Sequence, residues 1–240
     1  MCSLGAEKPF YSHISKHIVD LNFVGGGAPS QCFPLYTYEA DGTRRDNITD
    51  WALQEFRERT RARAGTDGGI ADLSKEDIFY YVYAALHEPT WRADFALNLK
   101  KELPRIPWPD VTIPVAEWVR IGRALAQLHL DYESGPRQAL EWVETKQPVH
   151  FRVTKMKRVN DSIVVNETLT LAGIPPIAWT YKLGNRSALE WLIDQYQLDG
   201  DSDPNAYSDD PMYIVNLVER VAYVSVQTCA LVAQLSGISE

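Results

Sequence analysis

The stretch HFRVTKMKRVNDSIVVNETLTL, residues 150–171, decides the fold class of this chain. It is rich in Val, Ile and Thr, which favour strands, and it lies between regions with helical spacing. Asn160-Asp161 divides it with residues typical of a tight turn, which predicts a β-hairpin. We expect the first strand before this turn and the second over 162–171, with Asn166 inside the second strand.

Helical segments are predicted on both sides of this hairpin. Apolar residues at helical spacing predict helices over 47–63, 74–87, 89–102, 115–132, 187–198 and 211–236. Shorter strands are expected over 18–24 and 31–38, and Asp41-Gly42 predicts a turn. This order predicts an α+β fold, a helix-rich domain with an antiparallel β-hairpin or small sheet and a long C-terminal core helix.

Composition narrows the class of protein. Apolar residues make up 45% and charged residues 23%, which is ordinary for a globular chain and not for a disordered one. No apolar run reaches the length of a membrane-spanning helix, and no secretory signal is visible. Cys2, Cys32 and Cys229 are scattered and form neither a disulfide framework nor a zinc pair, so we expect a cytoplasmic protein.

Charge is distributed unevenly along the chain. The net charge of −8 argues against a protein that coats nucleic acid through general charge attraction. Residues 150–186 nevertheless carry six basic and two acidic side chains, whereas the last forty residues carry six acids and one arginine. Because binding fields are set by local clusters, the acidic total still allows a focused binding face within 150–186.

The basic side chains of the hairpin are the first candidates for binding. Strand periodicity predicts that Arg152 and Arg158 share one face and that Lys155 and Lys157 point to the other. Basic side chains on both faces are typical of a ribbon that follows phosphates, or of a hairpin that is simply solvated.

A second polar cluster, YKLGNR at residues 181–186, precedes a predicted helix. Asn pairs with adenine and Arg with guanine in base-edge recognition, which makes Asn185 and Arg186 candidate base readers. The same residue types also serve as helix caps and turn residues.

Catalytic motifs are largely missing from the chain. It has no phosphate-binding glycine loop, no GxSxG and no adenine-methyltransferase motif. His13 and His17 are four residues apart but lack the glutamate of HExxH and a third ligand. The catalytic alternative is a small metal-dependent nuclease that would use Asp110, Glu144 and Lys146. Asp110 lies in a proline-rich loop, and Glu144 and Lys146 lie at an expected helix end, which are unusual places for such a site.

Four segments, in order, resemble the C-terminal target-recognition domain of type ISP restriction-modification enzymes. They are QCFPLY (31–36), EDIFYYVYAALH (76–87), LPRIP (103–107) and IPP to YKLGNRSALEWL (174–192). The resemblance covers about residues 22–235. It implies an N-terminal segment or linker remnant over 1–21 and a target-recognition (specificity) domain over 22–240.

The resemblance implies a DNA-reading domain that is not catalytic by itself and needs no cofactor. In that family it follows a nuclease, a helicase-like ATPase and an adenine methyltransferase on one polypeptide. The implied partners are double-stranded DNA and these upstream modules, with no membrane. A protein-docking module for the methyltransferase is the other alternative, beside the nuclease.

Recognition of DNA needs phosphate contacts for position and base-edge contacts for identity. Our phosphate candidates are Lys155, Lys157, Lys182, Arg44 and Arg45. Our base-edge candidates are Arg158, Asn185, Arg186 and Arg105. Arg105 lies on a loop stiffened by prolines, where it can equally pair with a carboxylate.

Overall fold

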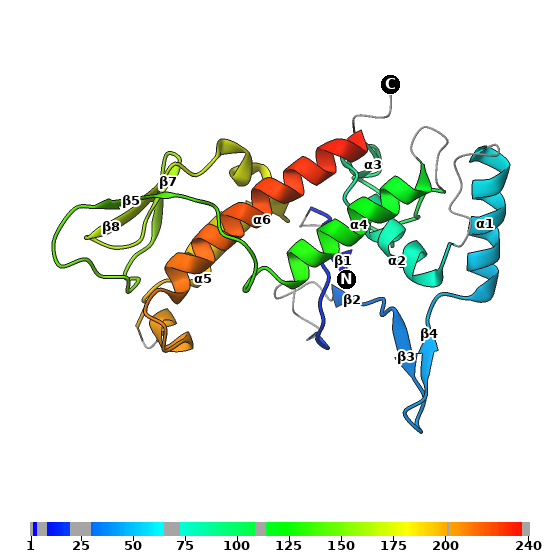
Figure 1. The fold of residues 1–240 in the computed structure, drawn as a ribbon, viewed down its shortest axis with the longest axis horizontal. Helices are drawn as coiled ribbons and strands as arrows, with labels where there is room; N and C mark the ends of the chain where they lie inside the picture. Colours follow the sequence, from blue (N-terminus) through cyan, green and yellow to red (C-terminus); the bar gives the residue numbers. More distant parts are fainter. Residues whose placement is uncertain are drawn as a thin grey trace. The chain divides into compact units, whose positions relative to one another are not determined.

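The computed structural model describes most of the chain, namely residues 2–3, 9–19, 30–64, 73–108, 114–200 and 202–236. The chain falls into two compact units, Met1–Leu130 with Leu231–Glu240, called here the helical unit, and Asp131–Ala230, the sheet unit. Within the described residues, the helices, the small antiparallel sheets and the long last helix confirm the predicted α+β class (Figure 1). The predicted boundary between residues 21 and 22 lies outside the described residues, as do Gly25 to Gly27 and most of the predicted strand over 18–24.

The helical unit consists mainly of four predicted helices and the end of the last helix. They are α1 (Asp50–Ala64), α2 (Lys75–Ala85), α3 (Pro89–Asp94) and α4 (Val115–Leu130). Two antiparallel strand pairs accompany them, β1 (Cys2–Ser3) with β2 (Ser30–Gln31) and β3 (Tyr36–Tyr38) with β4 (Arg44–Asp46). The helix at Pro89 ends earlier than expected and continues as a series of turns to Lys101.

The β3–β4 hairpin corrects the single strand predicted over 31–38, which is interrupted between Gln31 and Tyr36. The predicted Asp41-Gly42 turn is confirmed: Gly42 has φ +84°, a conformation that glycine adopts freely, and its N–H donates to the Glu39 carbonyl at 2.9 Å. Nothing in the sequence predicts β4, because its residues RRD have little strand propensity.

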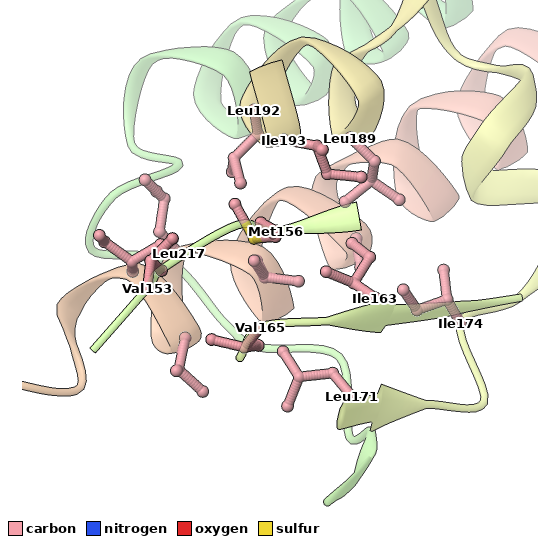
Figure 2. Close-up of a cluster of buried hydrophobic side chains, with 14 of the residues drawn as sticks. Val153, Met156, Ile163, Val165, Leu171, Ile174, Leu189, Leu192, Ile193 and Leu217 are labelled. Atoms are coloured by element: carbon pink, nitrogen blue, oxygen red, sulfur yellow. The ribbon is translucent and has the colours of Figure 1, made fainter. Parts of the chain in front are cut away.

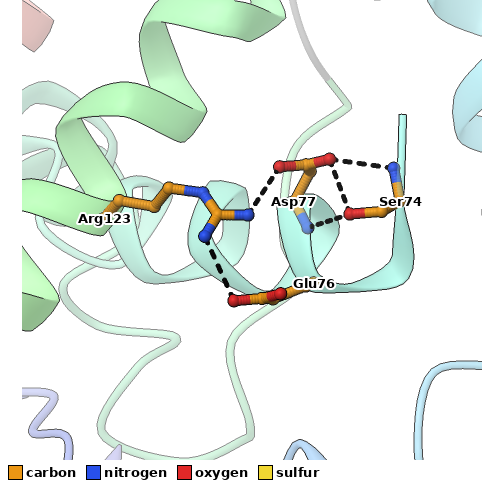
Figure 3. A network of polar contacts seen from close by, with 4 residues as sticks. All are labelled: Ser74, Glu76, Asp77 and Arg123. Carbon is orange, nitrogen blue, oxygen red and sulfur yellow. Dashed lines mark hydrogen bonds and ion pairs between the residues drawn. The ribbon is translucent and has the colours of Figure 1, made fainter. Parts of the chain in front are cut away.

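Side-chain caps mark the starts of α1 and α2. Thr49 Oγ1 accepts a hydrogen bond from the first turn of α1. Ser74 Oγ accepts from the Asp77 backbone N–H at 3.1 Å, and Asp77 Oδ2 accepts from the Ser74 N–H at 2.9 Å, which completes a capping box (Figure 3). From α4, Arg123 reaches Glu76 at 3.1 Å and Asp77 at 2.9 Å, so the cap also joins the two helices.

Helices α2 and α4 touch where α4 has a glycine. A Cβ atom at Gly122 would lie 1.9 Å from the carbonyl oxygen of Tyr80 on α2, so any side chain there would force the backbones apart. Around this contact, buried side chains from α2, α4 and the end of α6 form the core of the unit: Ile78, Tyr81, Ala84, Ile121, Leu125 and Leu235.

Two buried histidines lie side by side in this unit. The rings of His87 and His129 are 5.6 Å apart, His87 Nδ1 donates to the Tyr83 carbonyl at 2.8 Å, and the Tyr83 hydroxyl is 2.6 Å from His129 Nδ1. Burial lowers the pKa of His87 from 6.5 to about 4 and the pKa of His129 well below its usual value. Both imidazoles are therefore neutral in the folded protein at pH 7.

The sheet unit contains a four-stranded antiparallel sheet, a second strand pair and two helices. Its elements are β5 (Glu141–Glu144), β6 (Lys157–Val159), β7 (Ser162–Val164), β8 (Leu169–Ala172), the 3-10 helix η1 (Pro176–Thr180), β9 (Lys182–Leu183), β10 (Arg186–Ser187), α5 (Ala188–Gln195), the 3-10 helix η2 (Pro204–Tyr207) and most of α6 (Tyr213–Ser236). The strand order of the main sheet is β5-β8-β7-β6.

The main sheet confirms the hairpin and corrects the sequence prediction on either side of it. The turn at Asn160-Asp161 joins β6 to β7, and Asn160 has φ +52°. The predicted second strand is wrong beyond Val164, because the chain turns at Asn166 and returns as β8 along β7. The expected helix end at Glu144 is also wrong, since this residue closes β5.

The core of the sheet unit is formed by the main sheet, the segment before β6, α5 and α6 (Figure 2). Its central side chains are Val153, Met156, Ile163, Val165, Leu171, Ile174, Leu189, Leu192, Ile193 and Leu217. Burial on one face of the sheet fixes the register, because a shift by one residue would turn Ile163 and Leu171 away from the core.

In the part of the chain that the structure describes, we find no helix that combines the length and the apolar character needed to cross a bilayer.

Replacing Gly122 by alanine is expected to lower the free energy of unfolding by about 3 kcal/mol or more, although alanine favours helix by ~1 kcal/mol. The new Cβ cannot fit 1.9 Å from the Tyr80 carbonyl oxygen. Urea unfolding measures the effect, and Gln127→Ala on the exposed side of α4 is the control. Equal stability of Gly122→Ala and the wild type would contradict the close contact.

The two buried histidines predict that stability falls as pH decreases from about 6.5 towards 4. The unfolded chain binds protons there that folded His87 and His129 exclude, so the stability present above pH 6.5 is lost. The expected loss from His87 is about 2 kcal/mol by pH 5, and His129 adds to it in the same direction. Urea unfolding between pH 7 and 5 measures it, and a flat profile over that range would contradict the neutral pair.

Candidate nucleic-acid interface

Arg158 occupies the centre of the candidate interface in the sheet unit. It belongs to β6, and its guanidinium lies 3.8 Å from the ring centre of Trp179 on η1. Nε donates to the carbonyl of Asn160 at 3.0 Å, and Nη1 donates to Glu190 Oε1 at 3.2 Å. Because three groups hold one side chain, Arg158 is fixed in position although it remains partly exposed.

Glu190 connects this arginine to the start of α5. Its Oε2 accepts from the Ser187 N–H at 2.9 Å, and Ser187 Oγ accepts from the Glu190 N–H at 3.1 Å, which forms a capping box. The hydrogen bond from the Ser187 backbone, and further the Arg158 guanidinium, lower the pKa of Glu190. Glu190 is therefore ionised at neutral pH and links Arg158 on β6 electrostatically to the start of α5.

Asn185 and Arg186 lie on the β9–β10 hairpin directly before α5. Lys182 pairs with Ser187 and Leu183 with Arg186, and Gly184 has φ +73° in the turn. Asn185 is exposed at this turn, and Arg186 Nη1 donates to Asp194 Oδ2 at 2.5 Å.

Three exposed lysines, Lys155, Lys157 and Lys182, make no ion pair with any described residue. Lys157 precedes Arg158 on β6, and Lys182 lies across the hairpin from Ser187. The two lysines are thus neighbours of this site in the backbone, Lys157 of Arg158 along β6 and Lys182 of Ser187 across the hairpin. Lys155 is exposed on the segment that leads into β6.

The predicted distribution of the basic residues over two faces of one strand is wrong for Arg152 and Lys155, and it holds only for the consecutive residues Lys157 and Arg158. Only Lys157 and Arg158 belong to β6, whereas Arg152 and Lys155 precede it. Arg152 instead pairs with Asp203 at 2.8 Å. The alternation argument fails because strand β6 is only three residues long.

The remaining basic candidates belong to the helical unit. Arg44 and Arg45 lie on β4 of the β3–β4 hairpin, and both are exposed. Arg44 lies 4.3 Å from the ring centre of Tyr36, and Arg45 pairs with Glu39 at 2.7 Å. Arg105 is 87% exposed and pairs with Glu102 at 2.9 Å.

A single buried side chain, Asn166, fixes the path of the chain into the candidate interface. Its Nδ2 donates to the carbonyls of His150 at 2.7 Å and Arg152 at 2.8 Å. Its Oδ1 accepts from the Thr168 N–H, the Thr168 hydroxyl and the Leu169 N–H at 2.7, 2.8 and 3.0 Å. The amide therefore forms the β7–β8 turn and anchors the segment that leads to Lys155 and β6.

Sequence reasoning missed Trp179, Glu190 and Asp194. The pattern Ser-x-x-Glu at residues 187–190 was a signal for Glu190, since it is the signature of a capping box. No local signal indicates Trp179 or Asp194, because their contacts with Arg158 and Arg186 form only in the folded chain.

The residues of the nuclease alternative do not form a metal site in the described part of the chain. Asp110 lies outside the described residues. Glu144 Oε2 accepts from Gln147 at 2.8 Å, and Lys146 pairs with Glu167 at 3.2 Å. The described residues hold no group of three or more His, Cys, Asp or Glu side chains that could bind a metal ion.

Comparisons with known proteins give one consistent family. A family model for the Type ISP C-terminal specificity domain matches residues 1–217. One similar solved structure is a nuclease-deletion mutant of the Type ISP restriction-modification enzyme LlaGI in complex with a DNA substrate mimic. It is 37% identical in sequence, with a TM-score of 0.76, and the match covers 97% of this chain and 20% of that chain.

Two further structures contain DNA. The structure of the DrdV–DNA complex is 32% identical in sequence, with a TM-score of 0.78. The match covers 97% of this chain and 24% of that chain. The ATP-dependent Type ISP enzyme LlaBIII bound to DNA has 32% identity and a TM-score of 0.78, with coverage of 98% of this chain and 16% of that chain. The chain thus spans at most 24% of the length of these three structures. No curated protein matches it.

Replacing Asn166 by alanine is expected to lower the free energy of unfolding by about 3 kcal/mol or more, because buried backbone groups lose their partners. Asn166→Asp is also destabilising, since it replaces the two donors by oxygen opposite the carbonyls of His150 and Arg152. Urea unfolding measures both variants. The exposed Asn185→Ala is the control, and a similar small effect of Asn166→Ala would contradict the anchoring role.

Proposed function

The chain belongs to the Type ISP C-terminal specificity domain family, and from this membership we propose that it reads the sequence of double-stranded DNA for a restriction-modification enzyme. The three similar structures, at 32 to 37% identity, are complexes with DNA or a DNA mimic. In the chain itself, the observation that supports the proposal best is the pair of held arginines, Arg158 and Arg186, together with nearby exposed lysines that pair with no acid among the residues that the structure describes.

The sheet unit offers both kinds of contact that DNA recognition needs. We assign phosphate contacts to Lys155, Lys157 and Lys182, whose ammonium groups form no ion pair with a carboxylate in the described part of the chain. We assign base-edge contacts to Arg158, Asn185 and Arg186, since the groove edges of bases accept hydrogen bonds from these side chains.

The helical unit supplies further candidate contacts. Arg44 and Arg45 are exposed on the β3–β4 hairpin, and we propose them as phosphate contacts. Arg105, the fourth base-edge candidate, is highly exposed, and its carboxylate partner among the described residues is the surface side chain of Glu102. An exposed pair of this kind is weak, so DNA can replace it.

In the proposed assignment, residues 22–240 form the recognition domain, and the chain does no catalysis and binds no cofactor. Its partners are DNA and the upstream methyltransferase and helicase-like modules of a longer polypeptide. Bacterial DNA lies in the cytoplasm, which is where we propose that the chain acts. With a net charge of −8, the chain alone should bind DNA with strong salt dependence and with a Kd of about 1 μM or weaker.

Selection of bound sequences from a random duplex pool at low salt tests the proposal. Enrichment of one motif, followed by tighter binding of that duplex than of a scrambled one, is the expected result. Binding without enrichment would contradict sequence reading by this chain alone. No DNA binding but tight binding to a methyltransferase module would favour the docking alternative, and Mg2+-dependent cleavage lost in Asp110→Ala would favour the nuclease.

Lys157→Ala is expected to weaken binding several-fold for the selected and the scrambled duplex alike, and to reduce the salt slope by about one, because phosphate contacts carry no sequence information. Lys155→Ala should behave in the same way. Titration of both duplexes at several salt concentrations measures these effects.

Lys146→Ala is the matched control in the same unit, since Lys146 follows the opposite edge strand β5 and pairs with Glu167. It should leave both affinities unchanged. A loss of affinity in Lys157→Ala that is confined to one base pair of the selected duplex would contradict the phosphate role.

A further inference from the structure

Two arginines from different hairpins meet carboxylates on one face of α5. Arg158 comes from β6 and pairs with Glu190 at 3.2 Å, and Arg186 comes from β10 and pairs with Asp194 at 2.5 Å. Glu190 and Asp194 are four residues apart, which places them one turn apart on the same side of the helix. The opposite side of α5 is buried through Leu189, Leu192 and Ile193.

Each pair leaves its arginine able to donate further. A guanidinium has five N–H donors. Arg158 uses Nε and Nη1, and Arg186 uses Nη1 alone in the contacts described above. At least two N–H donors on each guanidinium therefore remain, enough for the O6 and N7 acceptors of a guanine. Arg158 is 40% exposed and Arg186 51% exposed, so a ligand can reach both.

Stability does not account for the Arg186–Asp194 pair. Ion pairs between exposed side chains stabilise a fold very little. Asp194 lies in the last turn of α5, where a negative charge is unfavourable because of the helix dipole. A carboxylate beside a DNA-binding face also repels phosphates, so Asp194 weakens general binding. What the pair does provide is a fixed direction for the long Arg186 side chain.

We infer that Asp194 and Glu190 are positioning residues, which hold Arg186 and Arg158 in the orientation that reads base edges. The inference rests on the proposed function and goes one step beyond it, because it assigns sequence discrimination to two acids that do not touch the bases. Loss of such an acid lowers discrimination while the affinity for unrelated DNA stays the same or rises.

Asp194→Ala in the full chain is the decisive variant, because it leaves the cap of α5 intact. Binding is titrated with the duplex selected by the wild type, with its single-base-pair variants and with a scrambled duplex. We expect discrimination at one base pair to fall by about tenfold, on the order of one bidentate arginine contact. Asp194→Glu, which keeps the carboxylate, should restore most of the discrimination.

Glu190→Gln is the second variant. The amide oxygen of glutamine can still accept from the Ser187 N–H and keep the capping box, whereas the charge opposite Arg158 is lost. It should lower discrimination at a different base pair. Asp209→Ala, which removes an exposed acid of the same unit, is the control and should leave discrimination unchanged.

Two results would overturn the inference. Asp194→Ala could weaken all duplexes equally, which would make Asp194 a structural residue, or it could keep full discrimination. The double variant Arg186→Ala with Asp194→Ala should lose no more at that base pair than Arg186→Ala alone, and an additive loss would also count against it. If the wild type selects no motif, the proposed function fails first, and this result is distinct from that of the variants.

Discussion

The sheet unit depends on the hydrogen bonds of one buried amide, that of Asn166. Its oxygen closes the turn between β7 and β8, and its nitrogen holds the carbonyls of His150 and Arg152. The first contact sets the order of strands in the main sheet, and the second fixes the segment that enters β6. Because the amide is buried, every bond that it fails to make would leave a backbone group without a partner.

On this frame, an acidic protein brings several basic side chains together near the start of α5. The β6–β7 hairpin, η1 and the start of α5 meet through Arg158, Trp179 and Glu190. Lys157 and Lys182 lie beside this contact without carboxylate partners among the described residues. The net charge of −8 therefore says little about the surface that would face DNA, since nearby groups dominate the field there.

Sequence reasoning succeeded where the signal was local and failed where it was not. The turns at Gly42 and Asn160 and the helix that begins after Ser74 are confirmed, because each depends on residues close in sequence. Asn166 was placed inside a strand, since nothing nearby reveals that its amide binds backbone 14 and 16 residues earlier. Among the site candidates, residue type identified Arg158 and Arg186, but the partners that hold them could not be read from the sequence.

The sequence by itself determined the α+β class, the six helices found in the described residues, the β6–β7 hairpin and, through four ordered segments, the family that the matching model confirms. Tertiary structure alone decided the four-strand order, the β3–β4 hairpin and the meeting of Arg158 and Arg186 with the acids of α5. The physical reason is range: caps, turns and periodicity act within a few residues, whereas strand pairing and ion pairs across hairpins join residues that only the packed core brings together.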